Sequence, residues 1–200
     1  MFYIFPKAVP KDVCKQYLDY CLKNAQFEDA SVVKNGFTVF DSNDSSHESN
    51  HGIRKTDISF INDGNNLMNE LCWGFIREAN SRLFKYKLDH FQPIQFARYQ
   101  DGGHYDWHQD DIMREVNGGK EVRKLSLTFS LTDDSEYDGG LLEFFNGNIE
   151  LKKDGKNLAE DIKSVGTAIV FDSSDWHRVT PVTRGIRYSL VCWTVGPNFE

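Results

Sequence analysis

The sequence predicts a mainly β protein of the α+β class, in which N-terminal helices pack against a C-terminal β-sandwich or barrel. From residue 93 onward, short β-rich segments alternate with turns rich in Gly and Asp. This pattern is typical of antiparallel sandwiches and barrels rather than of parallel βαβ units. Before residue 90, apolar residues recur at helical spacing in two segments. An aromatic content of 14% also suits packed sheets.

Six elements are expected before residue 90. Pro10 suits the first turn of a helix, and apolar residues on one face follow it. A second helix is indicated by apolar residues from Leu67 to Leu83 at helical spacing, whereas residues 41–52 are polar without an apolar pattern. In chain order the elements are a strand at Phe2–Phe5, a helix at 10–24, a strand at Phe37–Phe40, a polar loop at 41–52, a strand at Lys55–Ile61 and a helix at 65–84.

The second half of the chain is expected to form the sheets. In one strand the apolar Leu125, Leu127 and Phe129 alternate with polar residues, so a polar stripe faces one side. A polar stripe on a buried strand needs partners, and a ligand pocket would supply them. Thr128 and Ser130 are therefore candidate pocket residues. The expected strands are Ile94–Tyr99, Lys124–Leu131, Leu141–Phe145, Thr167–Phe171 and Ile186–Val195.

Length and charge narrow the class of protein. A chain of 200 residues suits one domain, 1–200, with residues 1–90 as helical and strand support and 91–200 as the β core. The net charge of −7 disfavours binding to nucleic acid. Residues 1–10 have neither the basic region of a signal peptide nor a membrane-spanning apolar run.

The cysteines are scattered and form no C-x-x-C pair, which indicates neither a zinc site nor a disulfide framework. We expect free buried thiols and a cytoplasmic location. The four positions are Cys14, Cys21, Cys72 and Cys192.

The segment 98–110 contains two His-x-Asp pairs, His104–Asp106 and His108–Asp110. On an extended strand, residues two apart project to the same face, so an imidazole and a carboxylate in this order can hold one metal ion. Spacing alone does not choose between the pairs. His177 is the candidate third ligand, and two imidazoles with one carboxylate suit a non-haem Fe(II) oxygenase.

The run Tyr99-x-x-Gly102-x-x-Tyr105-x-x-His108-x-Asp110 resembles the signature of the prolyl 4-hydroxylase-like (PKHD-type) branch of the Fe(II)/2-oxoglutarate-dependent oxygenases. Matched residue by residue, the resemblance puts the metal ligands and catalytic residues at His108 and Asp110. It leaves His104 and Asp106 outside the signature. Residues 173–182 resemble the distal-histidine segment of this family, which supports His177. The strong matches span about residues 94–193.

The resemblance implies a double-stranded β-helix (jelly-roll, cupin-like) core with the helices on one sheet. It also implies Fe(II), 2-oxoglutarate as cosubstrate and O2, with ascorbate as a candidate reductant. Arg187 stands ten residues after His177, where the family has the arginine that pairs with the cosubstrate carboxylate. Tyr99 and Trp193 are further cosubstrate candidates, since Trp193 shares the strand face of Arg187.

The implied reaction hydroxylates an unactivated C–H bond and yields succinate and CO2. Within this branch a peptidyl proline is the first substrate hypothesis, so a peptide or protein partner is expected, and the 41–52 loop is a candidate lid. Two alternatives are an oxygenase of a free amino acid or small metabolite, and a non-oxygenase metal-binding cupin-like protein.

Three remaining features receive structural interpretations. Arg54 to Asp57 resembles a basic segment near the substrate side of related enzymes, but it is interpreted as a solvated basic patch. Arg178 and Arg184 are interpreted as loop arginines. Gly139 and Gly140 are expected to allow close backbone approach.

Overall fold

The computed structural model describes residues 1–30, 52–61, 66–116, 119–145, 152–153, 156–157 and 162–197. The expected strand at Phe37–Phe40 and residues 41–51 of the candidate lid lie outside these ranges.

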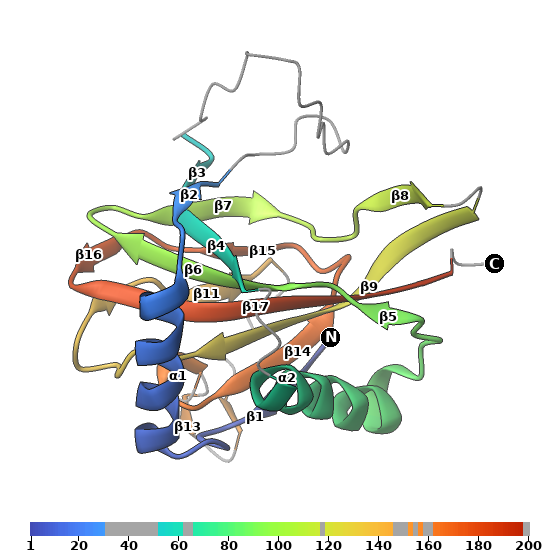
Figure 1. Ribbon diagram of the computed structural model, residues 1–200, viewed down its shortest axis with the longest axis horizontal. Helices are drawn as coiled ribbons and strands as arrows, with labels where there is room; N and C mark the ends of the chain where they lie inside the picture. The colour runs from blue at the N-terminus through green and yellow to red at the C-terminus, as the bar shows by residue number, and fades with distance from the viewer. Residues whose placement is uncertain are drawn as a thin grey trace.

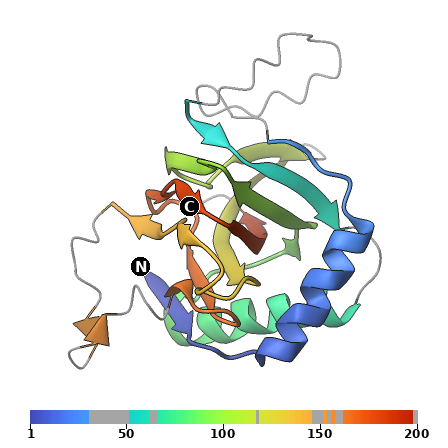
Figure 2. The same cartoon turned by 90° about the vertical axis from the view of Figure 1, so that its left-hand side faces the viewer.

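Two antiparallel sheets face each other and form the double-stranded β-helix that the family resemblance implied (Figures 1 and 2). The larger sheet has nine strands, seven of them in the order β1-β14-β9-β17-β6-β4-β2, with β5 and β8 pairing at β17 and β9. The smaller sheet has the order β11-β15-β7-β3, and two further pairs are β10-β16 and β12-β13. The strands of the larger sheet are β1 (Phe2–Phe5), β2 (Glu28–Asp29), β4 (Asp57–Ile61), β5 (His90–Phe91), β6 (Ile94–Gln100), β8 (Met113–Val116), β9 (Gly119–Ser130), β14 (Ala168–Asp172) and β17 (Ile186–Pro197). The remaining strands are β3 (Arg54–Lys55), β7 (His104–His108), β10 (Asp138–Gly139), β11 (Leu142–Phe144), β12 (Lys152–Lys153), β13 (Lys156–Asn157), β15 (His177–Val179) and β16 (Val182–Arg184).

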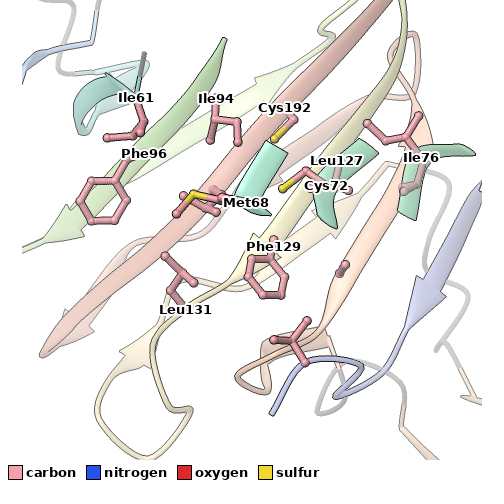
Figure 3. Close-up of a cluster of buried hydrophobic side chains, with 14 of the residues drawn as sticks. Ile61, Met68, Cys72, Ile76, Ile94, Phe96, Leu127, Phe129, Leu131 and Cys192 are labelled. Carbon is pink, nitrogen blue, oxygen red and sulfur yellow. The ribbon is translucent and has the colours of Figure 1, made fainter. Parts of the chain in front are cut away.

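Both helices pack on the outer face of the larger sheet, as predicted (Figure 2). Helix α1 (Lys11–Asn24) begins after Pro10, and α2 (Asn66–Ala79) continues into a π-helical turn, η1 (Asn80–Phe84). All four cysteines are free and buried in the core between helices and sheet, where Cys72 and Cys192 lie near Met68 (Figure 3). Within the described ranges, no helix is both long and apolar enough to cross a membrane.

The strand alternation predicted for β9 is present and separates two environments. Leu125, Leu127 and Phe129 are fully buried in the helix-covered core. The intervening Ser126 and Ser130 project to the opposite face, toward the smaller sheet. The same alternation in β17 puts Leu190 and Cys192 in that core and places Arg187, Ser189 and Trp193 on the polar side. The interior between the two sheets is therefore the polar one.

One expected strand is divided in the structure. The segment predicted as Lys55–Ile61 forms β3, which pairs with β7, and β4, which pairs with β6 in the other sheet. Thr56 lies at the crossing, where its hydroxyl donates to the carbonyl of His104 at 3.2 Å. Arg178 and Arg184, expected on loops, lie on β15 and β16 and pair with Glu143 and Asp138.

Truncating Leu127 to Ala is expected to lower the free energy of unfolding by about 2–5 kcal/mol, because a fully buried side chain leaves a cavity. Leu67→Ala is the matched control. Its side chain is 75% exposed, so the change is expected to stay within about 0.5 kcal/mol. Urea denaturation measures both variants. Equal losses would contradict the assignment of the helix-covered face as the core.

Candidate metal centre

Three side chains meet between the sheets. His108 ends β7 and His177 begins β15, and antiparallel pairing places these two residues directly opposite each other. The backbone N–H of Asp110 donates to the carbonyl of Ser173 at 2.7 Å, which brings its carboxylate to the same point. Asp110 Oδ1 lies 3.8 Å from His108 Nε2, and Oδ2 lies 3.6 Å from His177 Nε2. One ligand atom from each residue lies within 4.8 Å of the others.

Backbone carbonyls orient both imidazoles. The Nδ1 of His108 lies 2.7 Å from the carbonyl oxygen of Asp106, and the Nδ1 of His177 lies 2.8 Å from that of Asp175. Since a carbonyl only accepts, each Nδ1 is the protonated donor, and each Nε2 keeps its lone pair. Both lone pairs are thereby available to a metal ion beside Asp110.

The electrostatics favour the protonation states that a metal needs. Burial lowers the pKa of His108, and the neighbouring His177 lowers it further. Burial alone would raise the pKa of Asp110, but the charges of His177, His108 and Arg123 outweigh it, and the net shift is downward. At neutral pH the centre therefore offers a neutral His108 and an ionised Asp110.

Two serine hydroxyls lie behind the carboxylate of Asp110. Ser126 Oγ donates to Asp110 Oδ2 at 2.8 Å and lies 2.9 Å from Ser173 Oγ. Phe171 packs against the ring of His177, with centroids 4.7 Å apart. Both serines and Phe171 are almost completely buried, so bulk water is kept from this side of the centre.

Strand parity was the wrong reason for pairing His108 with Asp110. Strand β7 ends at His108, and Asp110 lies beyond it. The ladder is also irregular, because Val179 opposes Tyr105 while His177 opposes His108. The extra residue in β7 places Tyr105 and His108 on one face, where their rings stack 3.4 Å apart.

The alternative pair lies outside the cluster. His104 Nδ1 contacts the carbonyl of Gly102 at 2.9 Å, and the Asp106 carboxylate accepts from the backbone N–H of Trp107 at 2.8 Å. The structure thus brings together the three residues named from the family signature and leaves His104 and Asp106 aside.

Arg187 lies farther along the same interior. It is 4% exposed, and its Cζ lies 5.2 Å from the ring centre of Tyr99, which opposes it on β6. Its Nη1 donates to Ser189 Oγ at 3.2 Å. Among the described residues no carboxylate pairs with this guanidinium. A buried cation in this state is suited to an anionic ligand.

Close packing behind Arg187 explains two neighbouring residues. Gly140 has φ +59°, and a Cβ there would lie 2.9 Å from Arg187 Cδ. A Cβ on Gly139 would lie 2.0 Å from the carbonyl oxygen of Pro181, so both glycines serve close approach, as expected. The fully buried Tyr137 also lies beside Arg187, whose charge lowers the pKa of its phenol against the larger raising effect of burial.

The other pocket candidates occupy different places. Thr128 is half-buried on the polar face, and Ser130 Oγ donates to the carbonyl of Ile162 at 3.4 Å. Trp193 lies toward the metal end, since it opposes Ser126 on β9, the residue whose hydroxyl holds Asp110. Its buried indole N–H has no hydrogen-bond partner among the described residues. The guanidinium of Arg123 lies 3.9 Å from the Trp193 ring centre.

Four residues of this interior are not among the sites that the sequence predicts. Ser126 stood in the predicted polar stripe and Tyr105 in the signature, so signals existed for both. Tyr137 had no sequence signal. Arg54 is half-buried rather than fully solvated, because its Nε is buried and the guanidinium lies over the Tyr105 ring.

Residues 94–195 match the 2OG-Fe(II) oxygenase superfamily. The chain belongs to this family. The match covers β6 to β17 and with them His108, Asp110, His177 and Arg187. Membership implies Fe(II), 2-oxoglutarate and O2 as the reacting partners of this fold.

Relatives extend the comparison. A PKHD-type hydroxylase of Acidovorax ebreus is 34% identical over 139 residues, which are 66% of this chain and 57% of the relative. The chain spans about half the length of the curated relatives it matches.

Solved prolyl hydroxylases share the fold. A prolyl-4-hydroxylase of Pseudomonas putida is 21% identical, with a TM-score of 0.62 over 96% of this chain and 91% of that one. A prolyl hydroxylase of Trichoplax adhaerens, solved with a hypoxia inducible factor peptide fragment, is 18% identical. Its TM-score is 0.64 over 96% of this chain and 82% of that one.

The donor set fits the metal of the family. Two imidazole nitrogens and one carboxylate are the donor set that non-haem Fe(II) oxygenases use, so His108, Asp110 and His177 would hold such an ion. The buried guanidinium of Arg187 fits a dicarboxylate cosubstrate, because its positive charge can pair with a carboxylate.

Removing the hydroxyl of Ser126 tests whether its hydrogen bond to Asp110 orients this carboxylate for the metal. In Ser126→Ala, Asp110 loses a 2.8 Å hydrogen bond, and the affinity for Fe(II) is expected to fall roughly tenfold to hundredfold. Anaerobic metal titration measures it. Ser81→Ala, at an exposed hydroxyl bonded to the carbonyl of Glu78, is the control and is expected to change nothing. Unaltered Fe(II) affinity in Ser126→Ala would show that the bond does not orient the ligand.

Proposed function

We propose that the protein is an Fe(II)- and 2-oxoglutarate-dependent dioxygenase that hydroxylates an unactivated C–H bond of a peptidyl proline. The observation that carries the proposal is the convergence of His108, Asp110 and His177 in one buried cluster. The buried, acid-free Arg187 supports the cosubstrate assignment and disfavours a metal-binding cupin without oxygenase activity.

In this proposal His108, Asp110 and His177 hold the iron through Nε2, a carboxylate oxygen and Nε2. Bound iron and 2-oxoglutarate supply the oxidising chemistry with O2, which releases succinate and CO2. The tethered Nδ1–H groups keep both imidazoles oriented, and Ser126 keeps the carboxylate oriented.

Other residues of the chain bind the cosubstrate and line its pocket. Arg187 pairs with the distal carboxylate of the cosubstrate, with Tyr99 and Thr128 lining the same face of the sheet. Trp193 forms the wall beside Ser126 at the metal end, whereas Ser130 supports the pocket through its bond to Ile162. The buried Phe171 excludes water beside His177, so the reacting groups meet in a dry space.

The substrate assignment is supported by the prolyl hydroxylases that share the fold, one of them solved with a peptide fragment. Ascorbate is proposed as the reductant that keeps the iron ferrous between turnovers. The lid role of the 41–52 loop stays a prediction, since residues 41–51 lie outside the described ranges.

Replacing His108 with Ala is expected to abolish succinate formation from 2-oxoglutarate, because the iron loses one of its three protein ligands. His104→Ala, the other histidine of the segment, is expected to retain turnover. Both are measured with Fe(II), ascorbate and a proline-containing peptide panel, with mass spectrometry for the added oxygen. Activity in His108→Ala together with inactivity in His104→Ala would reverse the ligand assignment.

Arg187→Gln is expected to raise the KM for 2-oxoglutarate by at least about thirtyfold, because the carboxylate loses a charge-assisted partner worth roughly 2–5 kcal/mol. Arg184→Gln is the matched control, since that exposed guanidinium pairs with Asp138 instead. Succinate formation at varied cosubstrate concentration separates KM from kcat. An unchanged KM would remove Arg187 from the pocket.

A further inference from the structure

Arg54 points into the same interior as the metal centre. It lies on β3, the edge strand of the smaller sheet, directly opposite Tyr105 of β7. Opposed residues of antiparallel strands project to the same face. Tyr105 packs with the buried Val179 on the inner side, so the Arg54 side chain is directed between the two sheets.

The guanidinium of Arg54 is separated from the metal centre by a single ring. Its Cζ lies 4.3 Å from the ring centre of Tyr105. That ring is stacked on His108 at 3.4 Å. A group bound to Arg54 would therefore lie one aromatic ring away from the imidazole of His108.

Arg54 has no acidic partner within the part of the chain that the structure describes. Its Nε is buried and lacks an acceptor. Other arginines are paired: Arg98 with Asp57 at 2.9 Å and Arg178 with Glu143 at 2.7 Å. A buried N–H of a cation without an acceptor is costly, and an anionic ligand would offset that cost.

The cosubstrate does not balance this charge. The two carboxylates of 2-oxoglutarate and that of Asp110 carry three negative charges, which Fe(II) and Arg187 neutralise. Beyond these charges, Arg54 has no carboxylate partner among the described residues, and the anion of a bound substrate would balance it.

We propose that Arg54 binds a carboxylate of the substrate and so makes the enzyme selective for acidic substrates. The inference rests on the proposed function and refines its substrate class. A planar guanidinium matches a carboxylate through two parallel hydrogen bonds. The carboxylate comes either from an acidic residue beside the target in a peptide or from the main-chain carboxylate of a free amino acid.

Two matched pairs of probes distinguish these sources. The peptide pair is acetyl-Asp-Pro-Gly amide and acetyl-Asn-Pro-Gly amide, and the amino-acid pair is L-proline and L-prolinamide. Calorimetric titration uses the full chain with Fe(II) and 2-oxoglutarate under anaerobic conditions. The wild type is expected to bind the carboxylate member of one pair about tenfold more tightly, as a charge-assisted hydrogen bond provides. The pair that shows this preference identifies the source, and a preference confined to L-proline would replace the peptidyl substrate of the proposed function by a free amino acid.

Variants connect the preference to the guanidinium. Arg54→Gln is expected to abolish it, and Arg54→Lys, which keeps the charge, to retain part of it. Arg77→Gln is the control, because Arg77 lies 5.1 Å from the Trp73 ring centre on α2, outside the site. If Arg54→Gln does not fold, as judged by circular dichroism, Arg54→Met takes its place and keeps an aliphatic stem over Tyr105.

Equal binding within both wild-type pairs, or no binding of any probe, would overturn the inference, as would a preference that persists in Arg54→Gln. These outcomes are separate from the proposed function. Triad-dependent succinate formation without a carboxylate preference rejects only the role of Arg54. A carboxylate preference without succinate formation rejects only the oxygenase reaction.

Discussion

The pairing of β15 with β7 is the interaction on which the metal centre depends. It sets His177 opposite His108, although the two residues are far apart in the chain. The irregularity in the same ladder rotates Tyr105 onto the face of His108, so a ring stack supports the imidazole. The bond from Asp110 N–H to the Ser173 carbonyl then brings in the carboxylate from just beyond the strand. A slip of one residue in this ladder would disperse all three ligands.

The larger sheet separates two kinds of interior. Its outer face is apolar and covered by both helices, and this packing supplies the rigidity that a site needs. Its inner face buries ionic groups, which are tolerated only when partners satisfy them. Asp110 has such partners in Ser126 and the two imidazoles, whereas Arg187 and Arg54 have no protein carboxylate among the described residues. We therefore assign ligand carboxylates to these two guanidinium groups.

The local pattern of apolar and polar residues predicted most elements, because an element that is buried on one face has apolar residues at regular spacing. Strand β1 and helix α1 appear where the sequence placed them, apart from Pro10, which precedes the helix. The prediction of one continuous strand at 55–61 was wrong, because the chain passes from one sheet to the other at Thr56. The segments before and after Thr56 each have the pattern of a strand. Which sheet a strand joins is decided by its pairing with distant strands, and the residues next to it in the sequence do not specify that pairing.

The sequence by itself determined the chemistry available: the donor types at His108, Asp110 and His177, and the cation at Arg187, because residue identity and motif spacing carry that information. The tertiary structure decided what surrounds them. Ser126 behind the carboxylate, Tyr137 beside Arg187 and Arg54 over Tyr105 are contacts between distant segments. Their geometry follows from strand register and from one extra residue in β7, and both are set by the packing of the whole fold rather than by neighbouring residues.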